Sequence, residues 1–297
     1  MEAAQERDAP LIAEAACALG MDNPAVTALS GGSRNRCYRL AQGPLDVVLR
    51  IAGDGDATYA VERGTELLAQ RTAARQGLAP RLLLEDPERG YVVMEHLSGP
   101  VWSRAWAASP AGASRLGEWL GRLHAVAVPP GLRRISFVEV LDDYCARLAP
   151  GLPAAALADR CAELAHAFEP SAAPVLCHND LHHRNLVESA GRLCAVDWEY
   201  AGAGDPVMDL AGYVAYHDLS GDATRSLLAA YAAHGYAPTR ESLSQARWLF
   251  EAVWWAWLEL LRRETCAEPP ELAATRAGLE RRLARPAREA GTPKAPT

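Results

Sequence analysis

Residues 175–211 read VLCHNDLHHRNLVESAGRLCAVDWEYAGAGDPVMDLA, and this stretch carries the clearest chemical pattern in the chain. Asp180 and Asn185 lie five residues apart on a polar segment, and Asp197 follows an apolar run twelve residues beyond Asn185. A carboxylate and an amide at this spacing converge on one point of a loop, and a second carboxylate on a neighbouring strand completes a site for Mg²⁺. Phosphoryl transfer needs this set, because one carboxylate orients the acceptor hydroxyl while the other oxygen ligands hold the metal on the phosphates.

The spacing matches the protein-kinase pattern H-R-D-L-x-x-x-N followed by the aspartate of D-F-G. Here the first segment reads H-N-D-L-H-H-R-N from residue 178, and the second reads D-W-E from residue 197. The alternative interpretation takes Asp180, Asn185 and Asp197 as turn residues that cap short strands, and it fits each of them singly. It does not explain why two acidic loops each follow an apolar run, so we favour the kinase interpretation.

The block resembles the aminoglycoside phosphotransferase and choline kinase superfamily, and it looks especially like bacterial choline kinases and thiamine kinases. The resemblance extends over roughly residues 25–265 and is most specific in the segment quoted above. It implies a two-lobed α+β fold similar to that of protein kinases, with a small antiparallel sheet in the N-terminal lobe and a mostly helical C-terminal lobe.

The pattern of apolar residues agrees with this organisation. Strand-like runs between turn residues occupy residues 26–29, 37–40, 47–51, 81–85 and 91–95. Helical periodicity covers residues 10–20 and 61–77 and predominates beyond residue 99. We therefore expect a nucleotide-binding lobe over residues 1–96, a catalytic and acceptor-binding lobe over 97–286, and a disordered tail over 287–297.

The resemblance assigns roles to residues of the quoted block. It implies that Asp180 is the catalytic base, that His178 supports the loop around it, and that Asp209 anchors that loop. The Mg²⁺ ligands that it implies are Asn185, Asp197 and, in addition, Glu199. Only eight residues separate Asp197 from Asp205, and no A-P-E triplet follows, so a long activation segment is excluded and a small-molecule acceptor is favoured.

The basic residues narrow the choice of phosphate-binding cation. Among the 30 basic residues the one lysine is Lys294, close to the C-terminal end, so the cation has to be an arginine. Arg50 follows the apolar run VVL on a predicted central strand, and choline kinase relatives resemble this chain in carrying arginine there. Its expected partner on the next helix is Glu66, with Glu62 as the competitor, and a solvated strand-end arginine is the alternative interpretation.

Two backbone segments complete the expected nucleotide site. The predicted phosphate loop comprises Gly31, Gly32, Ser33 and Asn35, because glycines let a backbone turn tightly and approach phosphate oxygens. A plain hairpin turn is the alternative interpretation of this segment. By resemblance, the adenine edge meets the backbone around Glu95 and Leu97, at the junction of the lobes.

The acceptor pocket is predicted on the segment RWLFEAVWWAWLELLRR, residues 247–263. Helical spacing places Glu251, Trp254 and Trp255 on one face, and aromatic rings beside an acid suit an ammonium group. Choline kinases have a similar tryptophan-rich helix, but tryptophans at helical spacing also occur in cores, and both interpretations stay open. Glu199 and Asp205 would add negative potential for a cationic substrate.

Composition excludes several other classes of protein. The net charge of −7 argues against a nucleic-acid coat, and no apolar run approaches the length needed for membrane insertion. No signal-peptide pattern begins the chain, and the seven cysteines form no C-x-x-C pair, so we expect a cytoplasmic protein with reduced thiols. His182 and His183 lack further ligands at zinc spacing and are expected to be variable loop residues.

These observations predict a small-molecule kinase that uses ATP and Mg²⁺ and works as a monomer or homodimer. The acceptor would be a small cationic alcohol of the choline, ethanolamine or thiamine type. An aminoglycoside O-phosphotransferase is the nearest alternative, and a non-catalytic nucleotide-binding regulator is the alternative from a different class. Intact Asp180, Asn185 and Asp197 argue against the regulator.

Overall fold

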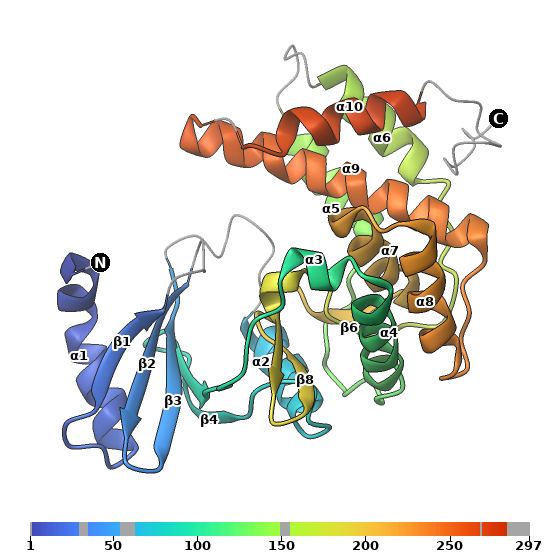
Figure 1. The fold of residues 1–297 in the computed structure, drawn as a ribbon. Coiled ribbons are helices and arrows are strands. Elements are labelled where there is room, and N and C mark those ends of the chain that lie inside the picture. The colour runs from blue at the N-terminus through green and yellow to red at the C-terminus, as the bar shows by residue number, and fades with distance from the viewer. Residues whose placement is uncertain (1, 30–34, 54–62, 149–154, 268, 284–297) are drawn as a thin grey trace. The chain divides into compact units, whose positions relative to one another are not determined.

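The computed structural model describes residues 2–29, 35–53, 63–148, 155–267 and 269–283 (Figure 1). The chain divides into two compact units. The first comprises Met1–Ser103 and His183–Tyr200, and the second comprises Arg104–His182 and Ala201–Thr297. The predicted lobe boundaries at residues 96 and 286 stay predictions.

The first unit contains a five-stranded antiparallel sheet in the order β1-β2-β3-β5-β4 (Figure 1). Its strands are β1 (Ala25–Leu29), β2 (Arg36–Gln42), β3 (Leu45–Ile51), β4 (Leu82–Asp86) and β5 (Tyr91–Glu95). All five stand where apolar and β-branched runs between turn residues predicted them. The antiparallel sheet expected for the N-terminal part is therefore confirmed.

Two helices of this unit cover opposite faces of the sheet. They are α1 (Glu2–Ala18) and α2 (Arg63–Ala74). Along β3, Val47, Leu49 and Ile51 alternate into the core beneath α1. Because successive side chains of a strand point to opposite faces, Val48 and Arg50 face the side of α2.

Helix α1 is longer than the helix expected over residues 10–20, and it contains Pro10 in its interior. Proline removes one intrahelical hydrogen bond, and contacts with the sheet offset that cost. Asp8 is 2% exposed and accepts hydrogen bonds from Arg36 Nε at 2.6 Å and from Tyr38 Oη at 2.8 Å. The helix start was not visible in the sequence because this long-range ion pair holds the turn before the proline.

A hairpin from later in the chain also belongs to the first unit. Its strands are β7 (Leu186–Ser189) and β8 (Arg192–Ala195). The backbone N–H of Ala195 donates to the Leu78 carbonyl at 2.9 Å, which fixes the hairpin beside the loop after α2. On its other side the chain passes so close that a Cβ at Gly99 would lie 1.4 Å from the Glu188 carbonyl oxygen. Only glycine fits at this crossing.

The second unit is mostly helical, as expected. Its helices are α3 (Arg104–Ala107), α4 (Pro110–His124), α5 (Phe137–Arg147), α6 (Ala155–Ala165), α7 (Pro206–His217), α8 (Gly221–Ala232), α9 (Arg240–Thr265) and α10 (Leu272–Leu283). Helices α4 and α8 approach closely, because a Cβ at Gly117 would lie 2.4 Å from the Leu227 carbonyl oxygen. Helix α9 packs against α7, α5 and α10.

A two-stranded sheet positions the polar loops of this unit. It pairs β6 (Val175–Cys177) with β9 (Gly202–Gly204), antiparallel. The sequence did not predict β9, since its residues Gly-Ala-Gly have no strand propensity. Close packing requires glycine at position 202, because a Cβ there would lie 2.4 Å from Cγ1 of Ile135. The pairing brings the loop after β6 beside the start of α7.

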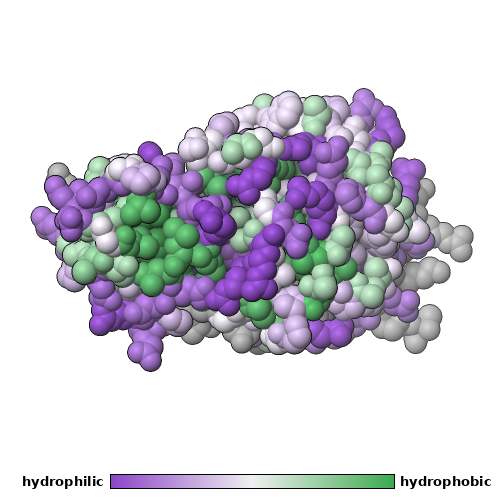
Figure 2. All heavy atoms as spheres, turned by 90° about the horizontal axis from the view of Figure 1, so that it is seen from below, coloured by the Kyte–Doolittle hydropathy of each residue, from purple (hydrophilic) through white to green (hydrophobic). Residues whose placement is uncertain are grey.

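Hydrophilic side chains cover much of the face shown in Figure 2, and apolar areas lie between them. Large hydrophobic side chains exposed among the described residues are Leu29, Leu45, Leu83, Val101, Trp106 and Val128. No helix among the described residues is long and apolar enough to cross a membrane.

The buried ion pair of Asp8 predicts a pH-dependent contribution to stability. Burial raises the pKa of Asp8, but hydrogen bonds from Arg36 and Tyr38 outweigh it and hold this pKa below its ordinary value of 3.8. A lowered pKa stabilises the fold above 3.8, and this stabilisation is lost as the pH falls below that value. We expect Asp8→Asn to lower the free energy of unfolding by about 2 kcal/mol at pH 7.

Urea denaturation of both proteins at pH 7, 5, 4 and 3 measures this difference, which should shrink below pH 4. Asp22→Asn is the control, because Asp22 is exposed in the same unit. A difference that stays constant down to pH 3 would contradict the assignment.

Candidate active site

A buried ion pair lies on the α2 side of the first unit's sheet. Arg50 Nη1 of β3 contacts Glu66 Oε1 in the first turn of α2, and their side chains are 12% and 5% exposed. Burial lowers the pKa of Arg50, but the charge and hydrogen bond of Glu66 outweigh it, so this pKa lies above its ordinary value. Asp197 Oδ1 is 3.9 Å from the same nitrogen. The structure thus pairs Arg50 with Glu66, as the sequence predicted.

The predicted metal ligands lie at one end of the β7–β8 hairpin. Asn185 directly precedes β7, and Asp197 follows β8 by two residues. The N–H of Val196 donates to the Asn185 carbonyl at 2.9 Å, which extends the ladder to this end. Asp197 has a left-handed backbone with φ of 63°, a conformation in which aspartate is enriched and which re-aims its side chain. Glu199 is half-buried in the turn after it.

The donor set at this hairpin end suits a hard divalent cation. A carboxylate and an amide carbonyl are oxygen ligands of the kind that Mg²⁺ takes. The residues present therefore fit the expected metal.

The predicted nucleotide segments are placed in part. Gly31, Gly32 and Ser33 lie outside the described residues, whereas Asn35 is half-buried just before β2. Glu95 ends β5, and Leu97 follows in the extended segment after it. Between them, His96 Nδ1 lies 3.0 Å from Asp46 Oδ2, which fixes this segment to the start of β3.

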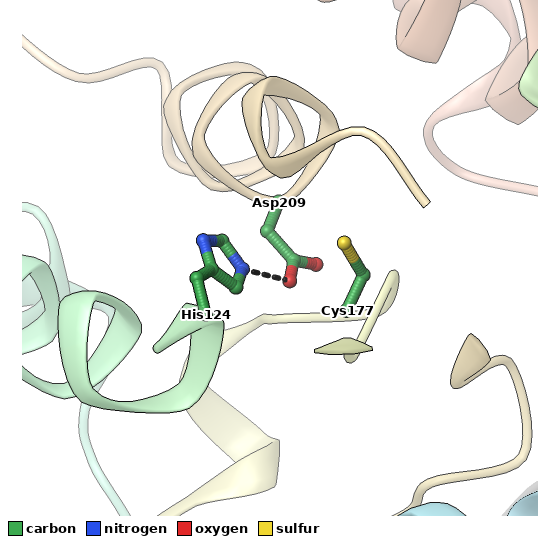
Figure 3. A group of neighbouring side chains, drawn as sticks. All are labelled: His124, Cys177 and Asp209. Carbon is green, nitrogen blue, oxygen red and sulfur yellow. Dashed lines mark hydrogen bonds and ion pairs between the residues drawn. The ribbon is translucent and has the colours of Figure 1, made fainter. Parts of the chain in front are cut away.

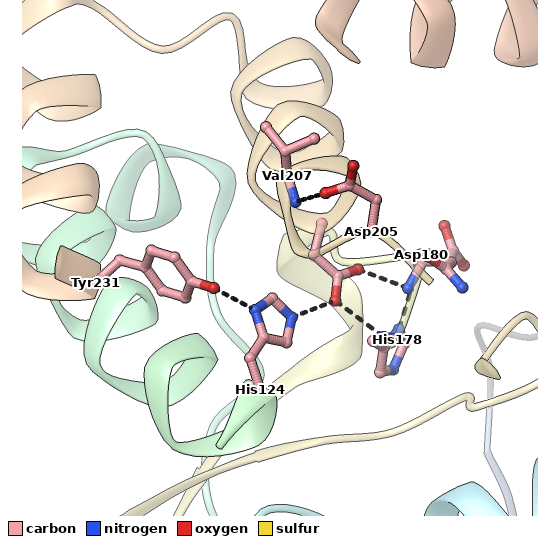
Figure 4. Close-up of polar contacts among 8 residues, drawn as sticks. His124, His178, Asp180, Asp205, Val207 and Tyr231 are labelled. Atoms are coloured by element: carbon pink, nitrogen blue, oxygen red, sulfur yellow. Dashed lines mark hydrogen bonds and ion pairs between the residues drawn. The ribbon is translucent and has the colours of Figure 1, made fainter. Parts of the chain in front are cut away.

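In the second unit a polar loop follows β6 and carries His178, Asn179 and Asp180 (Figure 4). The Asp209 carboxylate of α7 accepts the backbone N–H of His178 at 3.0 Å and that of Asn179 at 2.6 Å. The N–H of Asp180 donates to Nδ1 of the fully buried His178 at 3.3 Å. These bonds hold Asn179 in a left-handed conformation, with φ of 66°, and leave the Asp180 side chain 33% exposed.

His124, Cys177 and Asp209 form a buried group of potential metal ligands (Figure 3). Their hydrogen bonds oppose that role. His124 Nε2 lies 3.0 Å from Asp209 Oδ2, and its Nδ1 lies 2.7 Å from the Tyr231 hydroxyl. Burial raises the pKa of the Cys177 thiol well above its ordinary value, and the charge of Asp209 raises it further. A thiol and a fully bonded imidazole describe a structural network better than a metal centre.

Aromatic rings line up beside the Asp180 loop. The ring of His182 stacks on that of Tyr216, with centroids 5.1 Å apart, and Tyr216 stacks on Trp254 at 5.5 Å. His182 Nε2 lies 3.8 Å from Asp180 Oδ2, so the stack begins next to the predicted base. Arg104 contacts the stack at Tyr216. It donates to the Tyr216 carbonyl at 2.8 Å, and its Cζ lies 5.4 Å from the centroid of the tyrosine ring.

The structure distinguishes between the predicted acceptor residues. Trp254 is half-buried and joins the aromatic stack, whereas Trp255 is fully buried in the core. Glu251 accepts from Arg247 Nε at 2.9 Å on the same helix. Asp205 caps α7 through the Val207 N–H at 3.0 Å and accepts the Ser171 hydroxyl at 2.7 Å. Trp255 therefore agrees with the core interpretation of the tryptophan-rich helix, and an acceptor-binding role for Trp254 stays a prediction.

Sequence analysis did not identify His124 as part of these networks, and it took His182 as a variable loop residue. His182 and Tyr216 meet only through packing of the loop on α7. His124 carried a readable signal, because it lies four residues after Leu120 and hence on the apolar face of α4. A histidine on such a face needs a polar partner, and that partner is Asp209.

Comparison with known proteins supplies independent evidence. The sequence model of the phosphotransferase enzyme family matches residues 25–248. The thiamine kinase of Salmonella paratyphi A is 32% identical over 243 residues, which are 80% of each chain.

Solved structures agree with the predicted fold. The choline kinase LicA of Streptococcus pneumoniae has a TM-score of 0.77 at 20% identity, over 93% of this chain and 99% of LicA. LicA in complex with AMP has a TM-score of 0.74 at 20% identity, over 92% and 98% of the two chains. A macrolide 2'-phosphotransferase type I has a TM-score of 0.64 at 18% identity, over 92% and 97%. The expected kinase-like fold is confirmed.

The Arg50–Glu66 pair predicts strong coupling in stability. Replacing Arg50 leaves Glu66 as a buried charge without its partner, and replacing Glu66 leaves Arg50 with only the more distant Asp197. We therefore expect Arg50→Met and Glu66→Leu each to lower the free energy of unfolding by about 3 kcal/mol. The double variant should lie within about 1 kcal/mol of the parent protein, because it buries no charge.

Urea denaturation of the parent protein, the two single variants and the double variant measures these free energies of unfolding as a double-mutant cycle. The control is Arg71→Met, which removes an ion pair with Glu85 whose arginine is 45% exposed, and it should cost less than about 1 kcal/mol. Additive losses in the Arg50 and Glu66 variants would show that the two charges do not compensate each other.

Proposed function

Because the chain belongs to the phosphotransferase enzyme family and is a small-molecule kinase, we propose that it transfers the γ-phosphoryl group of ATP to a small cationic alcohol. Among such alcohols, thiamine is the acceptor that we propose. The similarity to thiamine kinase over most of both chains supports this choice, and the AMP complex of LicA supports an adenine nucleotide.

The first unit supplies the residues proposed to bind the nucleotide. Arg50 contacts the phosphates, and Glu66 holds its guanidinium in place. Both side chains are nearly buried, which restricts their motion. Asn185 and Asp197 hold Mg²⁺, with Glu199 as an additional ligand. When bound, the metal neutralises charge on the phosphates. Asn35, Glu95 and Leu97 are proposed to face the nucleotide from the strand ends that carry them.

The second unit supplies the proposed base. Asp180 orients the acceptor hydroxyl and takes its proton, because its carboxylate is accessible and its backbone is held in place through His178. The hydrogen bonds to Asp209 fix this loop before substrate arrives, and a base held in position needs little reorganisation during the reaction.

The observation that carries the acceptor assignment is the stack of His182, Tyr216 and Trp254 beside Asp180. Stacked aromatic rings attract a flat or quaternary cation through their π faces, and the carboxylate adds Coulomb attraction. Thiamine carries a flat cationic ring and a primary hydroxyl, so it satisfies both features.

One prediction concerns Asp180, the proposed catalytic base. Asp180→Asn removes the proton acceptor but keeps the size and the backbone bonds of the residue. We expect kcat to fall by about 10²- to 10⁴-fold, with nucleotide affinity unchanged within about twofold. ADP release measures turnover, and calorimetry measures ATP binding.

Asp222→Asn serves as control, since Asp222 is 75% exposed on α8 of the same unit. Turnover of Asp180→Asn within a few-fold of the parent enzyme would disprove the proposed base.

Another prediction concerns the acceptor. In an ADP-release assay with thiamine, choline, ethanolamine, an aminoglycoside and a macrolide, we expect thiamine to have the highest kcat/KM. Trp254→Leu keeps an apolar side chain but removes the π face, so KM for thiamine should rise about tenfold with kcat unchanged. Trp254→Phe keeps an aromatic ring and should raise KM only about twofold.

Equal KM values for the Leu and Phe variants would show that Trp254 acts through bulk alone. Preference for the aminoglycoside or the macrolide would overturn the acceptor and leave the phosphotransferase assignment in place.

A further inference from the structure

A chain of hydrogen bonds runs from α8 to the Asp180 loop, and its first two members, Tyr231 and His124, have no place in the reaction proposed above. The Tyr231 hydroxyl of α8 lies 2.7 Å from Nδ1 of His124, the last residue of α4. Nε2 of His124 lies 3.0 Å from Asp209 Oδ2, which also accepts the His178 N–H (Figure 4). Thus three helices and the loop are joined through one imidazole ring.

Every side chain of this connection is withdrawn from water. Tyr231 is 2% exposed, and the side chains of His124 and Asp209 are 4% and 0% exposed. A buried polar group that loses its partner keeps the full cost of desolvation, so each bond strongly determines the position of the next. The connection is therefore able to transmit a defined geometry.

The protonation states follow from the partners. Burial raises the pKa of Asp209, but the hydrogen bond and charge of His124 and the charge of His178 outweigh it, and the pKa lies below its ordinary value. An ionised Asp209 only accepts, so Nε2 of His124 carries the hydrogen in that bond. Burial raises the pKa of Tyr231, so its hydroxyl keeps its hydrogen where it meets Nδ1 of His124.

Backbone packing sets where Tyr231 lies. A Cβ at Gly117 of α4 would meet the Leu227 carbonyl oxygen at 2.4 Å and the Tyr231 nitrogen at 3.1 Å. The glycine thus lets α8 approach α4 until the tyrosine hydroxyl reaches the histidine.

We propose that Tyr231 is a positioning residue for the phosphotransfer reaction, acting through His124 and Asp209 on the backbone of residues 178–180. Its hydroxyl fixes the ring orientation of His124. The imidazole then holds the Asp209 carboxylate in the plane in which it accepts both loop N–H groups. This proposal rests on the proposed role of Asp180.

Tyr231→Phe tests the proposal, because it removes one oxygen and keeps the ring. The matched control is Tyr213→Phe, which removes another buried tyrosine hydroxyl, one that donates to the Ala107 carbonyl at 2.7 Å rather than to His124. We expect kcat of Tyr231→Phe to fall about tenfold while KM for ATP changes less than twofold, the factor expected for one lost positioning hydrogen bond. Tyr213→Phe should retain its kcat.

Hydrogen exchange of the peptide containing residues 176–182 gives a readout that does not depend on turnover. Its amides should exchange about tenfold faster in Tyr231→Phe and at the parental rate in Tyr213→Phe. An unchanged exchange rate in Tyr231→Phe would overturn the positioning role even if the acceptor assignment were correct. Faster exchange with no turnover on any acceptor would support the positioning role and refute the proposed function.

A double-variant cycle tests the route through His124. Glutamine at this position keeps a donor near Nε2 but offers no equivalent of Nδ1. In the His124→Gln background, Tyr231→Phe should change kcat less than twofold. A further tenfold loss would show that Tyr231 acts by another route and would overturn the proposal.

Discussion

The fully buried Asp209 carboxylate accepts two backbone N–H groups from the loop after β6 and the imidazole of His124 from α4. The loop has no regular structure that would fix its shape from within. The Asp209 carboxylate stabilises the left-handed Asn179, because it lies in the place where those N–H groups point. It thereby helps to position the half-buried Asp180 and the His182 ring that begins the aromatic stack. The second unit is thus organised around one buried charge.

The first unit instead holds a permanent cation, the Arg50 guanidinium, within an apolar layer. Arg50 occupies the face of β3 turned toward α2, where Val48 and Leu67 pack. Glu66 offsets the cost of burying it, and Asp197 contributes from the hairpin. Because guanidinium stays protonated and its plane is set by the carboxylate, the arrangement keeps its charge and direction over a wide range of pH. A lysine there would be a point charge of less defined direction.

Local patterns were sufficient to predict the five strands of the first unit's sheet and the closeness of Asn185 and Asp197, and the resemblance added the Arg50–Glu66 pair. Strand alternation fixes the face of Arg50, and the ladder of a hairpin fixes which residues share its end. The sequence did not predict contacts between helices. Tyr231 reaches His124 only because α4 and α8 approach over Gly117, and Trp254 differs from Trp255 only through the packing of α9. Such contacts depend on crossing geometry, which periodicity does not specify.

The two units therefore differ in how they resist disturbance. An ion pair of fixed charge fails as a unit when one partner is lost, since the remaining charge is stranded in the core. A hydrogen-bond network that loses one hydroxyl leaves a buried polar group unsatisfied, which costs about 1–3 kcal/mol and thus less than a stranded charge. Substitutions around Arg50 should accordingly act first on stability, whereas those around His124 should act first on the geometry of the Asp180 loop. If Tyr231 acts as proposed, substitutions at the α4–α8 contact change the turnover rate at a smaller cost in stability than substitutions at Arg50.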